Sequence, residues 1–298
     1  MTVLRVGCPM WAHRPWVGRF YPADTKPGSE LPLYARWCNA VEGNTTFYAE
    51  PSAPTVAKWA EQAPADFRFA FKLPRTVSHA KRLRDVATEV RGFLTAIEPL
   101  GERIGPVQVQ LPGSFGPDDV GVLLSFLRRL PTDWRWSLEV RHHGFFDGSV
   151  AHRSIDELCN ERGIGRVVLD TRPLFASPAV SEAAIDEQRK KPHLPIVLDA
   201  AGPHPIIRVI GGDAIDGTAG VMDGLLTWLP QVVGWLREGR EPHVFVHQPE
   251  NLDSPGLARA FHAAVRTEAG ALEPLPDPRM QVGGQTSMFE VSADEPWA

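Results

Sequence analysis

Short runs of apolar and β-branched residues recur along the chain, separated by stretches in which apolar residues have helical spacing. The runs predict eight strands, at residues 3–8, 39–44, 67–73, 106–111, 135–141, 165–170, 205–211 and 243–248. The stretches between them predict helices at roughly 30–38, 54–62, 86–99, 117–130, 150–162, 223–238 and 255–268, with a weaker one near 181–190. Strands that alternate with helices in this way imply a parallel sheet.

Eight such repeats favour an α/β fold of the (β/α)8 TIM type, a barrel that forms a single domain with a C-terminal tail. An open doubly wound sheet is the alternative. The barrel is preferred because no glycine-rich GxGxxG turn follows the first predicted strand, where the chain reads GCPMW. We expect the barrel over residues 1–270. Residues 271–298 are rich in proline, glycine and acidic residues and have no period, so we expect a tail that is disordered or docked on the barrel.

Composition restricts the classes of function. In 298 residues, 31 Lys and Arg oppose 36 Asp and Glu, and the net charge of -5 argues against a surface that holds nucleic acid by charge alone. A local basic pocket stays open. Cys8, Cys38 and Cys159 are odd in number and far apart, which disfavours a disulfide framework and a structural zinc site. The sequence shows neither a signal-peptide pattern nor an apolar run long enough for a bilayer, so we expect a cytoplasmic protein without a membrane span.

Polar side chains close the apolar runs. In a barrel, the carboxyl ends of the strands hold the active site, so these residues are expected to converge there. They are Trp11, Glu42, Asn44, Lys72, Gln110, Glu139, Arg141, Asp170, Arg208, His247 and Gln248. Buried charges are expensive unless paired, and the mixture of three cations with three carboxylates is typical of sites for phosphate or carboxylate ligands. The alternative is a set of salt bridges that only fills the barrel interior, for which Glu139 and Arg141 have suitable spacing.

Other chemistries have weaker support. His142 and His143 are adjacent and invite a metal interpretation, but the three cations of the predicted pocket would repel a bare dication, so no metal ligand is assigned and the cofactor stays unknown. A nucleophilic serine is disfavoured because the chain has no GxSxG elbow. The aromatic residues near Trp11 and Tyr48 suit core packing, with stacking on a sugar or base ring as the alternative.

Five ordered segments resemble a known family. GCPMW with GRFYP (residues 7–22), YARWCNAVEGNTTFY (34–48), FRFAFKLPRTVSH (67–79), GPVQVQLPGSF (105–115) and SLEVRH (137–142) are similar to the signature segments of the YecE-like proteins, domain of unknown function 72. The resemblance implies a (β/α)8 barrel, similar to that of xylose-isomerase-like enzymes, without an established reaction. It also implies site residues at the matching positions, namely Glu42, Asn44, Thr46, Tyr48, Lys72, His79, Gln110, Pro112, Glu139, Arg141, Asp170 and Arg208.

These arguments predict two groups of site residues. The candidate catalytic residues are Glu42, Lys72, Glu139 and Asp170. The candidate ligand-binding residues are Asn44, Tyr48, His79, Gln110, Arg141 and Arg208. The predicted function is binding of a small anionic ligand, bearing phosphate or carboxylate, by a barrel protein that acts as an enzyme.

The tail supports an alternative function. Its segment QTSMF, with Gln285, Met288 and Phe289, resembles the short peptide by which bacterial repair and replication proteins dock on the sliding clamp. A DNA-repair or replication module recruited in this way is the second hypothesis, and nucleic acid is not excluded as a partner. Packing of Met288 and Phe289 onto the protein's own barrel is the other explanation of this segment.

Overall fold

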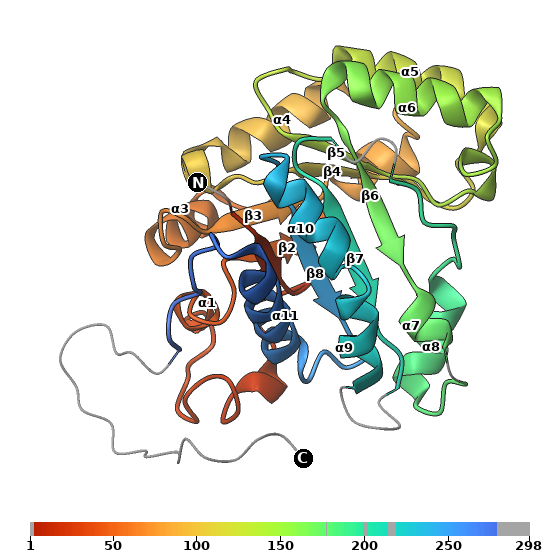
Figure 1. The fold of residues 1–298 in the computed structure, drawn as a ribbon. Helices are drawn as coiled ribbons and strands as arrows, with labels where there is room; N and C mark the ends of the chain where they lie inside the picture. Colours follow the sequence, from red (N-terminus) through yellow and green to blue (C-terminus); the bar gives the residue numbers. More distant parts are fainter. Residues whose placement is uncertain (1–2, 177, 199–201, 214–218, 279–298) are drawn as a thin grey trace.

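The computed structural model describes residues 3–176, 178–198, 202–213 and 219–278 (Figure 1). All eight predicted strands are confirmed within these ranges. They are β1 (Arg5–Gly7), β2 (Ala40–Gly43), β3 (Arg68–Phe71), β4 (Val107–Gln110), β5 (Trp136–Glu139), β6 (Gly165–Asp170), β7 (Ile206–Ile210) and β8 (His243–His247). The paired strands run parallel, as the alternation with helices predicts.

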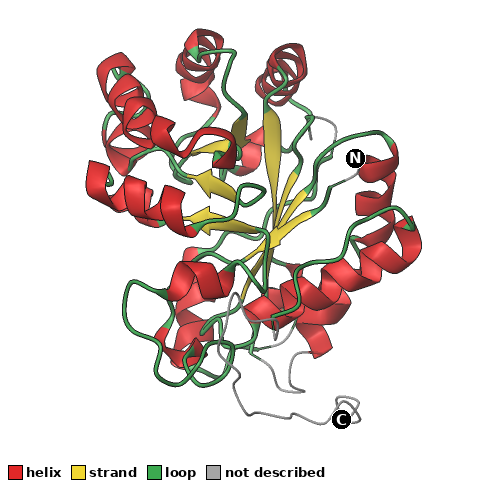
Figure 2. Cartoon of the chain, turned by 90° about the vertical axis from the view of Figure 1, so that its left-hand side faces the viewer, coloured by secondary structure: helices red, strands yellow, loops and turns green. Residues whose placement is uncertain are grey.

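Helices follow the strands and lie around the sheet (Figure 2). The α-helices are α1 (Glu30–Tyr34), α2 (Thr45–Tyr48), α3 (Ala53–Gln62), α4 (Ala87–Ile97), α5 (Val120–Arg129), α6 (Val150–Arg162), α7 (Arg172–Phe175), α8 (Glu182–Lys190), α9 (Ala219–Leu226), α10 (Leu229–Arg237) and α11 (Ser254–Ala269). The remaining helices are the π-helix η2 (Thr76–Ala80) and the 3-10 helices η1 (Arg14–Trp16), η3 (Glu98–Arg103), η4 (Pro117–Asp119) and η5 (His143–Phe145).

The helix predictions are correct in place and differ in detail. Ser52 and Ser149 cap α3 and α6 by accepting backbone N–H groups, as their positions predict. The helix predicted at 223–238 is two helices, α9 and α10, and Pro230 lies in the first turn of the second, where its missing N–H has no helical partner to lose. The sequence pattern did not reveal α2 or α7, because four residues are too few to show a helical period.

The strands form a curled parallel sheet and a two-stranded ribbon. Six strands pair in the order β1-β8-β7-β6-β5-β4, and β2 pairs with β3. Hydrogen bonds join the ribbon to both ends of the six-stranded sheet. On one side Glu42 N donates to Cys8 O at 3.0 Å, and on the other Leu73 N donates to Gln108 O at 3.0 Å. The fold is therefore a parallel α/β fold with a curled sheet, which confirms the predicted class in its coarser form.

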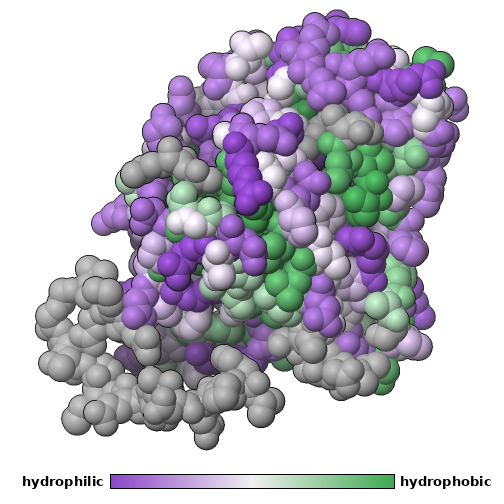
Figure 3. Space-filling model, in the orientation of Figure 1, coloured by the Kyte–Doolittle hydropathy of each residue, from purple (hydrophilic) through white to green (hydrophobic). Residues whose placement is uncertain are grey.

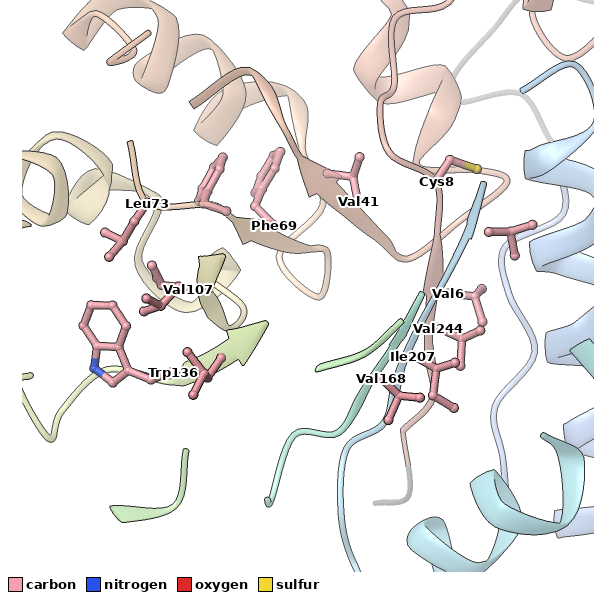
Figure 4. Packing of buried hydrophobic residues seen from close by; sticks show 14 of the residues in the cluster. Val6, Cys8, Val41, Phe69, Leu73, Val107, Trp136, Val168, Ile207 and Val244 are labelled. Carbon is pink, nitrogen blue, oxygen red and sulfur yellow. The ribbon is translucent and has the colours of Figure 1, made fainter. Parts of the chain in front are cut away.

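Two layers of apolar side chains hold the sheet. The large core lies between the strands and the surrounding helices, and Figure 4 shows Val6, Val168, Ile207 and Val244 pointing toward those helices from adjacent strands. A smaller cluster consists of Ala40, Ala70, Val167, Ile206 and Phe245. These five residues come from strands of both the sheet and the ribbon, so the cluster lies inside the curl.

The outer surface is mostly hydrophilic on the face shown in Figure 3, with hydrophobic residues grouped near the centre of that face. This pattern suits helices that bury one side on the sheet and expose the other. Among the described residues, none of the helices has the length and apolarity needed to cross a membrane.

The start of the predicted tail packs on the rest of the chain. Leu272 and Leu275 are buried in the large core, and Arg259 Nη1 donates to Pro276 O at 2.8 Å. The chain beyond residue 278, including Gln285, Met288 and Phe289, lies outside the described residues.

Candidate functional site

Alternation along the strands decides which polar side chains enter the curl. Side chains two residues apart lie on the same face of a strand. Moving two residues toward the carboxyl end from Ala40, Ala70, Val167, Ile206 and Phe245 of the inner cluster gives the next inner layer. That layer contains Glu42, Lys72, Leu169, Arg208 and His247. Four polar side chains therefore meet above an apolar plug, at the carboxyl ends of their strands.

Arg208 is the centre of this layer. Its Nε lies 2.6 Å from Glu42 Oε1, and its Nη2 donates to Glu42 Oε2 at 3.1 Å. Its Nη1 donates to Glu139 Oε2 at 2.8 Å. Arg141 then binds the other oxygen of the second carboxylate, with Nε donating to Glu139 Oε1 at 2.7 Å. The result is a continuous chain of ion pairs, which we call the mouth cluster: Glu42, Arg208, Glu139, Arg141 and the adjacent Lys72.

Further polar groups surround Glu42. Lys72 Nζ lies 3.7 Å from Glu42 Oε1 and His247 Nε2 lies 3.2 Å from Glu42 Oε2. Gln108 Nε2 and Asn44 Nδ2 also donate to this carboxylate, at 3.2 and 3.0 Å. The adjacent Glu42 and Asn44 in the sequence therefore form one unit, in which the amide orients the carboxylate and ties it to the loop after β1 through Pro9 O.

The carboxylates of the mouth cluster are buried but stay charged. Glu42 and Glu139 have no exposed surface. Burial alone would raise the pKa of Glu42, but Arg208 and Lys72 more than offset that effect and hold its pKa well below the ordinary value. Burial likewise opposes ionisation of Glu139, and Arg141 and Arg208 lower its pKa. The same two carboxylates raise the pKa of Arg208 against its own burial.

The pKa values of the basic groups Lys72, His247 and His79, in or near the mouth cluster, are lowered, which favours their neutral forms. Burial, reinforced by Arg208, lowers the pKa of Lys72 to about 7 and the pKa of His247 to about 4. Burial and the nearby Arg141 lower the pKa of His79 to about 4. At neutral pH the two histidines are therefore uncharged and Lys72 is close to its midpoint. Three cations then face two carboxylates, an excess of about one positive charge when Lys72 is protonated.

Several buried polar atoms near the mouth cluster have no hydrogen-bond partner among the described residues. They are Asn44 Oδ1, Gln108 Oε1, Gln110 Oε1, Ser137 Oγ, Arg208 Nε and His247 Nε2, the last two of which lie at ion-pair distance from Glu42 without hydrogen-bond geometry. Gln108 and Gln110 pair in register with Ser137 and Glu139, so these side chains share one face of β4 and β5. Buried polar groups in folded proteins are nearly always satisfied by protein, water or ligand. These atoms therefore offer hydrogen-bonding capacity directly beside the ion pairs.

Asp170 does not join the mouth cluster. Its register partner on β7 is Val209, whereas Arg208 pairs with Leu169, so the Asp170 side chain lies on the opposite face of the sheet. There it accepts hydrogen bonds from Arg172 Nε and Nη2, at 2.9 and 2.7 Å, and from Trp228 Nε1 at 2.7 Å. The expectation that Asp170 converges with the other carboxylates is thus corrected by the alternation of side chains along β6.

Residues of the loops lie at the rim. His79 belongs to η2, its Nδ1 lies 2.9 Å from Ser78 Oγ, and its ring contacts Phe47 edge-on at 5.0 Å. Tyr48 is 80% exposed and packs edge-on against Phe47. Of these residues, His79 lies within electrostatic range of Arg141, whose side chain is 16% exposed.

Trp11 and His142 have structural contacts outside the mouth cluster. Trp11 packs edge-on against Trp59 and Phe69, on the side of β3 that faces the helices. His142 accepts the Gly144 N–H and so caps η5, while His143 is exposed. The two adjacent histidines therefore have different surroundings. Within the described part of the chain, no three His, Cys, Asp or Glu side chains are grouped as a metal site.

Sequence reasoning missed Gln108 and Lys191. Gln108 lies inside an apolar strand rather than at its end. Its only sign in the sequence is that it alternates with apolar residues and so shares the inward face of the strand with Gln110. Lys191 follows α8, far from any strand, and its side chain is 17% exposed. Burial and the nearby Arg208 lower its pKa, which places it within electrostatic range of the mouth cluster.

A separate cavity of about 620 Å³ lies between α4 and α5, away from the residues of the mouth cluster.

The fold and the mouth cluster define a parallel α/β protein with buried ion pairs at the carboxyl edge of its sheet. The family described as "Protein of unknown function DUF72" matches residues 5–281, and the chain belongs to this family. The chain is 36% identical over 290 residues to the UPF0759 protein YecE of Escherichia coli K12, and the match covers 96% of this chain and all of that protein.

Solved structures support the fold. A DUF72 family protein from Thermotoga maritima has a TM-score of 0.64 and 23% identity, covering 90% of this chain and 99% of that one. A DUF72 family protein from Enterococcus faecalis has a TM-score of 0.63 and 18% identity, covering 89% and 98% of the two chains.

Proposed function

We propose that the mouth cluster binds a small anionic ligand, bearing phosphate or carboxylate, and that the protein is an enzyme acting on that ligand. The observation that carries this proposal is the chain of ion pairs from Glu42 through Arg208 and Glu139 to Arg141. Its two carboxylates are fully buried, whereas Arg141 reaches the surface with one side of its guanidinium group bound to Glu139. Guanidinium donors in this arrangement suit an oxyanion.

The charge balance supports an anion rather than a cation. Arg208 holds Glu139 and Glu42 with its two terminal nitrogens, so its charge mainly neutralises these carboxylates. Arg141 supplies the cation that reaches the surface, and Lys72 adds a further positive charge when it is protonated. The unpartnered oxygens of Gln110 and Asn44 accept hydrogen bonds only, so they suit the hydroxyl or amide groups of a ligand rather than its anionic end.

Closure of the strands into a complete barrel belongs to the same proposal. The backbone bonds from Glu42 to Cys8 and from Leu73 to Gln108 support it, because they connect the ribbon to both edges of the six-stranded sheet. A closed ring would place the mouth cluster where barrel enzymes carry their sites. A cytoplasmic location also remains our proposal, supported by the three free and buried cysteines Cys8, Cys38 and Cys159.

Titration calorimetry with inorganic phosphate tests the proposal. Replacing Arg141 by Ala should weaken phosphate binding by more than about tenfold, or roughly 1.4 kcal/mol. Arg84→Ala is the matched control, because Arg84 is an exposed arginine paired with Asp119, which keeps its second partner Arg82. Equal phosphate affinity in wild type and Arg141→Ala would leave Arg141 as a structural residue.

A second function has support from the sequence of the tail. We propose that Gln285, Met288 and Phe289 dock on a bacterial sliding clamp, because QTSMF combines the glutamine and the two apolar anchors of such peptides. Recruitment to DNA machinery would leave the anionic ligand of the mouth cluster unchanged or make it a nucleic-acid phosphate.

A further inference from the structure

We propose that Lys72 is a nucleophile that forms an imine with an aldehyde or ketone carrying a carboxylate or phosphate group. The inference rests on the proposed anion site and assigns its substrate class. The backbone of Lys72 is held by hydrogen bonds, whereas its amine lies 3.7 Å from its carboxylate partner Glu42.

The backbone of Lys72 is anchored on two sides. Its carbonyl oxygen accepts the Thr46 hydroxyl at 2.9 Å, and the next residue, Leu73, donates its N–H to Gln108 O at 3.0 Å. Lys72 follows directly after β3 and its side chain lies on the inner face, two residues beyond Ala70. The fold therefore determines where the Lys72 side chain begins, and its amine is directed toward the mouth cluster.

The amine itself has few contacts. Glu42 Oε1, at 3.7 Å, is the carboxylate oxygen within 4 Å of Lys72 Nζ among the described residues. That oxygen already lies 2.6 Å from Arg208 Nε and accepts from Gln108 Nε2. Arg208 is thus the closer partner of Glu42, and Lys72 is its more distant ion-pair partner. The separation of 3.7 Å is that of an ion pair and is longer than a hydrogen bond, so no hydrogen bond to Glu42 fixes the amine.

The surroundings also favour the neutral amine, which is the nucleophilic form. Only 7% of the Lys72 side chain is exposed, and Arg208 and Arg141 are nearby cations. Burial and Arg208 lower its pKa to about 7, whereas an ordinary exposed lysine titrates near 10.4. At pH 7 the neutral fraction of Lys72 is therefore about a thousandfold larger than that of an exposed lysine.

The reaction balances without a further reagent. The amine lone pair forms a C–N bond to the carbonyl carbon, and a proton moves from nitrogen to the carbonyl oxygen to give a carbinolamine. Loss of water, which carries the second amine proton, leaves the C=N double bond. Arg141 would hold the carboxylate or phosphate of the same molecule, so that the carbonyl carbon is presented to Lys72.

Reductive trapping tests the inference on the full-length protein. Glyoxylate is the anionic probe, acetaldehyde is the uncharged probe of the same carbon count, and sodium cyanoborohydride reduces any imine to a stable amine. Trypsin cleaves after an unmodified Lys72 but not after an alkylated one, so modification yields an uncut peptide of residues 69–75, between Arg68 and Arg75. The other five lysines, Lys26, Lys58, Lys81, Lys190 and Lys191, serve as internal references.

We expect glyoxylate to modify Lys72 at least tenfold faster than any other lysine at pH 7, and faster than acetaldehyde does. The rate should rise with pH and level off above about pH 8, following the titration of Lys72. Lys72→Arg should lose the modified peptide. Lys81→Arg should keep it, because Lys81 is an exposed residue paired with Glu89. The wild-type peptide map and pH profile decide the question even where Lys72→Arg does not fold.

The outcomes separate this inference from the proposed function. Phosphate binding without preferential modification of Lys72 would overturn the imine and leave the anion site in place. Equal rates for glyoxylate and acetaldehyde at Lys72 would overturn the anionic substrate class of this inference, whereas the proposed function is decided separately by phosphate calorimetry. Modification spread evenly over the exposed lysines would overturn the inference altogether.

Discussion

Arg208 and Glu42 are 166 residues apart in the chain, yet Arg208 Nη2 donates to Glu42 Oε2 at 3.1 Å inside the curled sheet. The two residues belong to β7 and β2, which are not paired strands. Their contact therefore spans the interior and ties the ribbon to the six-stranded sheet. Because Arg208 also binds Glu139 on β5, one guanidinium group connects three strands.

The first prediction concerns this connection. Arg208→Met should lower the free energy of unfolding by roughly 3–5 kcal/mol, because it leaves two buried carboxylates without their main partner. Urea unfolding followed by circular dichroism measures the change. The variant Arg208→Met with Glu42→Gln, which removes one charge of each sign and leaves Glu139 paired with Arg141, should recover part of the loss. Arg84→Met, on the surface, should change stability by less than about 1 kcal/mol. An Arg208→Met protein as stable as wild type would contradict the prediction.

The second prediction separates Asp170 from the mouth cluster. Asp170→Asn should lower the free energy of unfolding by roughly 1–3 kcal/mol, because the neutral amide cannot accept both hydrogen bonds from Arg172 together with that from Trp228. Phosphate affinity, measured by calorimetry, should stay within about a factor of two. A tenfold loss of phosphate affinity at unchanged stability would instead place Asp170 at the ligand.

The third prediction concerns acid unfolding. The pKa of His247 is about 4 in the folded protein and near 6.5 when exposed. Between about pH 4 and pH 6.5, His247 is therefore protonated in the unfolded chain and neutral in the folded protein. Stability should therefore fall as pH drops from about 6.5 to about 4. His243 and His262, whose pKa values are lowered to about 3 and about 4 by burial, contribute in the same direction.

The variant His247→Gln removes one of these contributions. The loss of stability between pH 6.5 and pH 4 should be smaller than in wild type by up to roughly 3 kcal/mol. Urea titrations at several pH values measure it, with the exposed His143→Gln as the control. If both variants show the same pH dependence as wild type, His247 titrates normally in the folded protein and the prediction is wrong.

The fourth prediction concerns the tail. A peptide of residues 280–292 should bind a bacterial sliding clamp with an affinity on the order of micromolar, as measured by fluorescence polarisation, since such peptides carry their contacts locally. Replacing Met288 and Phe289 by Ala should abolish the binding. In the full-length protein the same change should leave the melting temperature within about two degrees. Absence of clamp binding together with a clearly lower melting temperature would show that the tail covers its own protein.

The strand and helix pattern was largely accessible from sequence, and the site only in part. Glu42, Lys72, Glu139, Arg141 and Arg208 all close apolar runs, and the structure brings these five together. Asp170 closes its run in the same way but faces outward, because the inner residue of β6 is Leu169. A run that is buried on both faces gives no alternation to show which of its last two residues points inward.

By itself, the sequence determined the order of the elements, their parallel pairing and the concentration of charge at the carboxyl ends of the strands. These follow from local periodicity and from the short connections between neighbouring elements. The tertiary structure alone decided which charges meet, since the register between strands and the curl of the sheet bring Arg208 to Glu42 and leave Asp170 with Arg172. It also decided that Lys72 lies 3.7 Å from Glu42 and that Lys191 lies within electrostatic range of the mouth cluster, because both depend on distances between segments that the sequence does not relate.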